Sequence, residues 1–326
     1  MGRSRLVPVV LASALSVVET SGARPPGRAE VVETPAPATM PGASLPVVGV
    51  HWYRMAGRIR PLVFWIGRDE VGLARLVLRR GDAGERGYEL LVGTDPELAP
   101  RAINRWGYIV EETGSRGGSL LALMSPSDEV SFGEAQANVE RGGHGSVEFK
   151  AVRGRVDSGV ATWQPARVRT AGGPTIREVE PLLDRVRRET AAAASRSVRV
   201  PSGTRPGFLA AVAELVDLSL PTNSRRLRPN EIEDLPVPYA FGQGLYELRI
   251  RSLRPTSVAQ QEGRPAVRAL EAAFEIRTIA TGVRTRFDMV LGTDGQLAGV
   301  PLTIAWQPRW WLKVELHLDD ANRRLL

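Results

Sequence analysis

The sequence predicts an α+β fold: two antiparallel β-meanders, with barrel-like closure left open, separated by a helical middle segment. Three observations predict it. Short segments with alternating apolar and polar residues fill 60–125, a helical period runs through 176–220, and clean alternation returns over 244–318. Strands grouped apart from helices are typical of α+β proteins, whereas a parallel sheet would alternate strand and helix.

The first β-rich region is predicted from runs of alternating residues bounded by turn residues. The glycine-rich stretch from Gly81 to Gly84 favours a hairpin, because glycine and aspartate are typical turn residues. Ser131 and Glu134 form a capping box that predicts a short helix at 132–141. The expected strands are 60–67, 71–80, 86–94, 103–112, 118–125, 146–156 and 160–170.

The helical middle segment rests on capping residues and apolar spacing. Thr175 and Glu178 form a second capping box, which predicts a helix over 176–193. A second helix is expected over 204–220, because a proline follows Thr204 and an apolar stripe follows the proline. Between them 196–200 predicts a short strand, and the proline-rich 221–237 indicates a polar loop.

The C-terminal meander is expected to contain strands at 244–253, 268–280 and 284–291, with further strands around Ile304 and Leu312. A four-residue turn at 292–295 would place Phe287 opposite Val300. A loop over 306–310 would place Ile304 opposite Leu312. Trp306 and Trp310 would then cover the inner face of the sheet. Pro301 cannot donate to the ladder, so a bulge or a free edge is expected there.

The N-terminus has the features of a secretory signal. Arg3 and Arg5 precede an apolar run over 6–18, and the small residues Ser21 and Ala23 follow. We therefore expect an exported protein, periplasmic or secreted. The predicted organisation is a signal peptide (1–23), a Pro/Ala-rich linker (24–48), an N-terminal β-rich domain (49–172), a helical segment and loop (173–236) and a C-terminal antiparallel β-meander (237–320). Whether the two β regions form one sheet or two domains is left open.

Composition narrows the function classes. The chain of 326 residues is 43% hydrophobic and 24% charged, as in a folded globular protein, and its formal net charge is +7. Arginine supplies nearly all of the basic residues, which is typical of a GC-rich coding sequence, and the arginines are dispersed instead of forming a basic stripe. We therefore expect no nucleic-acid partner. The chain has no cysteine, which excludes disulfides and thiol catalysis. After the leader no apolar run is long enough for a transmembrane segment.

Recognisable catalytic motifs are missing from the sequence. It has no G-x-S-x-G elbow, no H-E-x-x-H pair and no P-loop. The histidines are His51, His144 and His317, and none lies in a metal-ligand spacing. We therefore expect no cofactor and no metal.

Two segments, 64–72 and 104–112, combine aromatic rings and charged side chains more densely than a strand requires. If their strands are neighbours, paired carboxylates could serve as acid and base, as in glycoside hydrolysis. The alternative interpretation is that arginine–carboxylate pairs decorate the outer face while the rings fill the core. The candidate catalytic residues are Asp69, Glu70, Glu111 and Glu112. The candidate ligand-binding residues are Trp65, Arg68, Arg105, Trp106, Tyr108 and the outward-pointing Trp311.

Several stretches resemble uncharacterised exported proteins of GC-rich bacteria that have a β-barrel-like C-terminal domain. The resemblance is carried by "RFDMVLGTDG" with "GVPLTIAW", and by "FWIGRDEVGLAR" and "INRWGYIVEE". No characterised family is among them, so the resemblance implies a barrel-like fold and export without implying an activity.

Together these features favour an exported, soluble bacterial envelope protein without enzymatic activity. Its expected partner is an apolar small molecule or an envelope protein, bound in or on a curved sheet. The alternative is an envelope glycan hydrolase that uses the paired carboxylates.

Overall fold

The computed structural model describes residues 45–60, 65–115, 117–124, 146–220, 228–233, 235–258, 266–309 and 311–319. The expected signal peptide, the expected helix at 132–141 and Trp310 lie outside these residues.

The described strands form one 14-stranded antiparallel sheet. The first run comprises β1 Val47–Ile59, β2 Ile66–Arg80, β3 Arg86–Thr94, β4 Trp106–Gly114, β5 Gly117–Met124, β6 Ser146–Asp157, β7 Val160–Ala171 and β8 Arg196–Arg199. The second run comprises β9 Val237–Phe241, β10 Gly244–Val258, β11 Val267–Thr278, β12 Arg284–Gly292, β13 Pro301–Arg309 and β14 Leu312–Leu318.

One pairing joins the two runs into a single sheet. Strand β1 pairs with β2 on one side and with β14 on the other, where Met55 lies opposite Leu316. The order is therefore β8-β7-β6-β5-β4-β3-β2-β1-β14-β13-β12-β11-β10-β9. The predicted α+β fold of two meanders with a helical middle segment is wrong. Local alternation identifies sequential neighbours, but it carries no signal for pairing between the first strand and the last.

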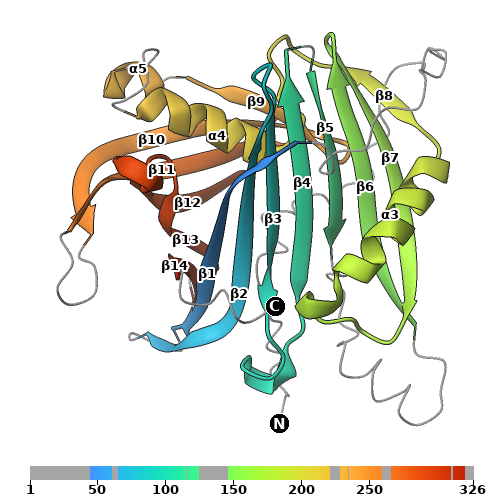
Figure 1. The fold of residues 1–326 in the computed structure, drawn as a ribbon, viewed down its shortest axis with the longest axis horizontal. Coiled ribbons are helices and arrows are strands. Elements are labelled where there is room, and N and C mark those ends of the chain that lie inside the picture. The colour runs from blue at the N-terminus through green and yellow to red at the C-terminus, as the bar shows by residue number, and fades with distance from the viewer. Residues whose placement is uncertain are drawn as a thin grey trace.

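The helices are short and cover opposite faces of the sheet instead of separating two domains (Figure 1). Helix α3 packs on β6 and β7, whereas α4 packs on β4, β9 and β10. The helices are α3 Glu180–Ala192, α4 Phe208–Ser219 and α5 Pro229–Glu233, with 3₁₀ turns η1 Pro100–Ala102, η2 Ile176–Glu178 and η3 Gly295–Leu297. The capping box of Thr175 and Glu178 is confirmed at the start of η2.

The two faces have separate apolar cores, and β4 shows how alternation divides them. Trp106 and Tyr108 belong to the cluster under α3, which contains Val186. Ile109 belongs to the cluster on the opposite face, which contains Leu215 of α4 together with residues from β4 to β7 and from β9 to β13. The sheet is therefore bent, so that the β9–β13 arm meets the β4–β7 arm across α4 (Figure 1).

The sheet is open, with β8 and β9 as its two edges. The chain that follows β8 then lies beside the other edge. The Arg205 N–H donates to the Pro238 carbonyl at 2.8 Å, and the Ala240 N–H donates to the Arg205 carbonyl at 3.0 Å. Some of the exposed backbone of β9 is therefore covered by the chain itself, as edge strands commonly require.

The predicted C-terminal hairpin registers are wrong, although the predicted faces are right. Phe287 lies opposite Trp306 instead of Val300, because the connection over 293–300 is longer than a four-residue turn and contains η3. Ile304 lies opposite Leu316 instead of Leu312. Each predicted register differs from the observed one by an even number of residues, so each side chain stays on its expected face. The irregularity expected at Pro301 is confirmed by a register shift.

Candidate ligand cavity

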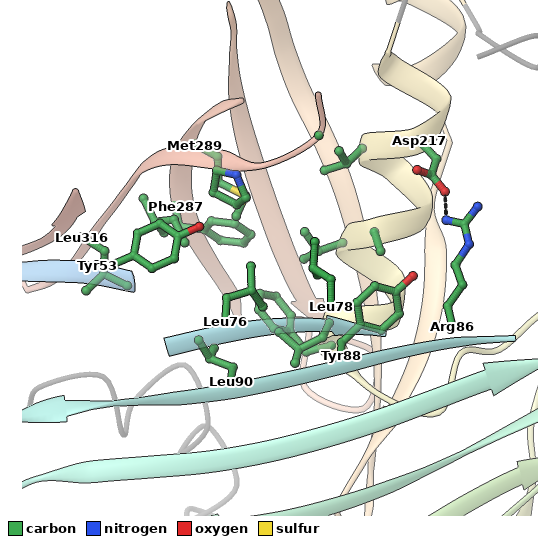
Figure 2. Close-up of a pocket in the computed structure, with 18 of the residues that line it drawn as sticks. Tyr53, Leu76, Leu78, Arg86, Tyr88, Leu90, Asp217, Phe287, Met289 and Leu316 are labelled. Atoms are coloured by element: carbon green, nitrogen blue, oxygen red, sulfur yellow. Dashed lines mark hydrogen bonds and ion pairs between the residues drawn. The ribbon is translucent and has the colours of Figure 1, made fainter. Parts of the chain in front are cut away.

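A cavity of about 270 Å³ lies on the α4 side of the sheet. Its walls come from strands β1 to β3, strands β11 to β14 and helix α4. Figure 2 shows labelled side chains from both sets of strands turned toward the same space, with α4 alongside.

The first wall is formed by alternate residues of β2 and β3. Leu76 lies opposite Leu90 and Leu78 lies opposite Tyr88 in the ladder, so these four side chains share one face. All four line the cavity and are only partly buried. Burial raises the pKa of Tyr88, so its hydroxyl stays neutral.

The second wall is formed by β12, β13 and β14. Phe287 and Met289 alternate along β12, opposite Trp306 and Ile304 of β13. Leu316 continues the wall on β14. These residues face the first wall because β1 brings β14 beside β2, so the cavity depends on the pairing that makes one sheet.

Helix α4 closes one side of the space. Phe208, Leu209, Val212 and Val216 fall on a helical stripe and line the cavity. The Phe208 ring also lies edge-on to Phe287, with ring centroids 5.7 Å apart. Other α4 residues, such as Leu215, are fully buried in the core, so one helix serves both the core and the cavity.

One end of the cavity is polar. Arg86 forms an ion pair with Asp217 of α4, drawn as a dashed line in Figure 2. Arg80 lies opposite Arg86 in the ladder, and both line the cavity. The opposite end carries the buried side chains of Tyr53, Phe287 and Leu316. The cavity therefore runs from a charged end to an apolar end.

Glu111, a candidate acid, is fully buried on the α4 face of β4. Its carboxylate accepts the N–H of Leu209 at 3.0 Å and that of Ala210 at 2.7 Å, so it caps the first turn of α4. Burial raises the pKa of Glu111 to about 7, although the backbone donors oppose the shift. A Cβ on Gly207 would lie 2.2 Å from the Glu111 carboxylate, so a larger residue at this position would displace the carboxylate or the helix.

Asp69 and Glu70 lie near the start of β2 and are exposed. Asp69 pairs with Arg58 at 3.2 Å, and Glu70 pairs with Arg54 at 3.6 Å. Such exposed pairs contribute little to stability because solvent screens them.

The pair Asp69 and Glu70 and the pair Glu111 and Glu112 lie at opposite ends of the neighbouring strands β2 to β4. Glu112 on β4 is opposite Gly87 on β3, which is opposite Arg79 on β2. Asp69 precedes Arg79 by ten residues on the same strand, which corresponds to about 30 Å at ~3.3 Å per residue. A glycosidase pair requires roughly 5–9.5 Å, so no acid–base pair forms between the two segments.

The candidate rings Trp106 and Tyr108 belong to the core beneath α3. Trp106 stacks on Phe149, with ring centroids 5.0 Å apart, and its Nε1 donates to the Pro174 carbonyl at 2.8 Å. Burial raises the pKa of Tyr108. Neither ring lines the cavity.

The remaining candidates also lie away from the cavity. Trp65 is 38% exposed, with the Arg60 guanidinium 5.9 Å from its ring. The Trp311 backbone carbonyl accepts the Arg60 backbone N–H at 2.7 Å.

Arg68 and Arg105 hold turns together. The Arg68 side chain donates to the Leu98 carbonyl at 3.2 Å. The backbone N–H of Arg105 donates to the Thr94 hydroxyl at 2.9 Å. Sequence reasoning missed the cavity, although one signal was present: Tyr88 and Leu90 on one face of β3, with Leu91 on the other, indicate a strand covered on both sides.

Among the residues that the structure describes, no three His, Asp or Glu side chains gather as a metal site would require. Within the same ranges no helix has the length and apolarity needed to cross a membrane.

Comparisons with known proteins place the chain in no characterised family. No family model and no curated protein matches it. Among solved structures it is similar to a β-barrel-like protein of the domain of unknown function DUF1849 from Brucella abortus. The two share 8% identity over 83% of this chain and 95% of that one, with a TM-score of 0.41. The residues of this chain define an open antiparallel β-sheet protein with a partly open, mostly apolar cavity.

Proposed function

We propose that this protein binds an apolar small molecule in the cavity beneath α4 and does not catalyse a reaction. The observation that carries the proposal is the cavity itself, about 270 Å³ with mostly apolar walls. Ligand sites are concave, largely apolar and supplied with a few polar groups, with volumes of roughly 300–1,000 Å³. The leucines and aromatic rings of the walls supply apolar contact, and the charged end supplies the polar groups.

The solvent contact of the apolar walls also supports occupation. The cavity is partly open, and wall residues such as Leu76 and Leu90 are only partly buried. A bound apolar molecule would remove this surface from water, which stabilises the complex by roughly 25 cal/mol per Å² of apolar surface buried.

The glycan-hydrolase alternative lacks comparable support. Asp69 and Glu70 form exposed ion pairs, Glu111 caps α4, and Glu112 lies beside Glu111 on β4, so the two pairs of carboxylates are about 30 Å apart along the strands. Asp217 is the one carboxylate among the described residues that line the cavity, and it is bound to Arg86. An apolar ligand also has more support than a protein partner, because the apolar side chains line a concave space with walls on several sides.

Export to the bacterial envelope is part of the proposal. Its support is the sequence over 1–23, where two arginines, an apolar run and small residues follow one another. The mass of the protein recovered from its host tests this step. Cleavage near Ala23 is the expected result, and an intact cytosolic chain would contradict it.

Native mass spectrometry of protein purified from its natural host tests binding. The expected spectrum contains a species heavier than the chain by one small molecule, which organic extraction releases. The extracted protein should then bind one equivalent of a fluorescent apolar probe, which the released molecule displaces. A bare chain that also fails to bind the probe saturably would overturn the proposal.

A further inference from the structure

The charged end of the cavity has more cationic than anionic groups. Arg80 and Arg86 turn their side chains to the cavity face, against the single carboxylate of Asp217 among the described lining residues. Arg79 also borders the cavity, but it alternates with Leu78 and Arg80 along β2, so its side chain leaves the sheet on the opposite face. A second acid nearby, Glu85, is turned into the β2–β3 connection, where it accepts the Ala83 N–H at 3.1 Å.

Arg79 and Arg86 are both already held by the protein. The Arg79 guanidinium donates to the Glu89 carboxylate at 3.1 Å and to the Leu45 carbonyl at 3.3 Å. Arg86 is bound to Asp217. The Arg80 side chain is exposed, and in the described part of the chain its guanidinium has no hydrogen-bond or ion-pair partner. Its backbone N–H is held by the Pro46 carbonyl, so the base of the side chain is fixed.

Arg80 and Arg86 are cross-strand partners, so their side chains leave the sheet from one face. The space beyond them becomes apolar, from Leu78 and Tyr88 to Phe287, Met289 and Leu316 (Figure 2). A ligand with a negative group at one end and a hydrocarbon chain at the other matches this order of side chains.

We infer that the ligand is a single-chain amphiphile with an anionic head group, which Arg80 binds with Arg86 beside it while the chain extends toward Phe287 and Leu316. The inference rests on the proposed function. A guanidinium binds carboxylate and phosphate equally well through paired N–H donors, so the shared chemistry is an anionic oxygen pair on an acyl or alkyl chain. The volume of about 270 Å³ is roughly twice that of a cavity that holds benzene, which suits one medium-length chain.

The test compares dodecanoic acid, dodecyl phosphate and dodecan-1-ol by titration calorimetry on delipidated full-length protein. These ligands share one chain and differ in the head group. The parent protein should bind each anion about tenfold more tightly than the alcohol, as a charge-assisted hydrogen bond at an exposed site provides. Arg80→Gln should remove most of this preference and leave the affinity for the alcohol unchanged. Arg254→Gln, an exposed arginine on β10 outside the cavity lining, is the matched control and should change neither affinity.

The possible results test the inference and the proposed function separately. If the phosphate binds better than the acid, a phosphate-bearing lipid is the source, and the reverse order indicates a free fatty acid; both support the inference. Equal affinities for alcohol and anions, or a preference that survives in Arg80→Gln, overturn the inference while the proposed function stands. If no ligand binds and the fluorescent probe also fails, the proposed function falls with it.

Discussion

At the scale of single residues, Glu111 shows how a buried carboxylate can be structural. It is 0% exposed, and two backbone N–H groups of α4 bind its oxygens. Desolvation favours the protonated acid, whereas the donors at the helix start favour the anion. The desolvation is larger, and the pKa of Glu111 rises to about 7.

This pKa predicts a pH dependence of folding. The unfolded chain ionises Glu111 near its ordinary pKa of 4.5, whereas the folded chain holds the proton until about pH 7. The stabilising contribution is therefore complete below pH 4.5 and is lost as the pH rises through 7. Relative to Glu111→Gln, which stays neutral, the parent should lose about 3 kcal/mol of unfolding free energy between pH 4.5 and 7.5. Urea denaturation across this range measures the difference.

Glu70→Gln is the matched control, because its carboxylate is exposed and its pair with Arg54 is screened by solvent. Its difference from the parent should stay within about 0.5 kcal/mol. A parent-minus-Glu111→Gln difference that is flat, or that grows with pH, would show that the carboxylate is not held as described.

The sequence identified Glu111 as noteworthy but could not assign its role. Within "IVEE" the alternation of β4 separates Glu111 from Glu112, but it does not tell which face is buried. The role of Glu111 comes from α4, whose first turn begins nearly a hundred residues later and meets it only in the folded state.

At the scale of elements, α4 is the piece on which the site depends. It is held at its first turn by Glu111 and near its last turn by the ion pair of Asp217 with Arg86. The Arg205 side chain, just before the helix, binds Glu214 through two N–H···O contacts, one of them 2.6 Å long. Between these contacts at its two ends, one face of α4 lines the cavity.

The close approach of Gly207 to Glu111 predicts a destabilised variant. Gly207→Ala would place its Cβ against the carboxylate at 2.2 Å, so the carboxylate must move away from its backbone donors or the helix must shift. We expect a loss of about 1–3 kcal/mol in unfolding free energy. In Gly114→Ala the new Cβ would meet its nearest neighbour at 3.6 Å, so this control should remain within about 1 kcal/mol of the parent. Equal behaviour of the two variants would contradict the contact.

Filling the cavity from α4 should separate binding from stability. Ala213 lines the cavity and is only partly buried, so Ala213→Phe puts a ring into empty space. The affinity for an apolar probe should fall at least about tenfold, while the melting temperature stays equal or rises because apolar surface is buried. Ala191→Phe, exposed on α3, is the control that should keep the affinity of the parent. Unchanged probe binding in Ala213→Phe would place the ligand elsewhere.

At the scale of the whole molecule, the sheet is one continuous surface because β1 pairs with β14. Side-chain period is local, so the sequence predicted most strands, the α3 and α4 helices and the inward face of Phe287 and Trp306. Register and the β1–β14 pairing depend on which distant strands meet, which alternation does not encode. The cavity arises from that pairing, so the sequence could not assign residues such as Leu76 to a site. It indicated instead the rings of Trp106 and Tyr108, which belong to the core.

The proposed ligand site is the space between this single bent sheet and α4. The most direct test is a crystal structure with an acyl chain brominated at its far end, located by anomalous scattering. We expect a bromine peak beside Phe287, Met289 and Leu316, with the head group near Arg80. A peak on the outer surface, or a structure in which these side chains fill the space and exclude the chain, would contradict it.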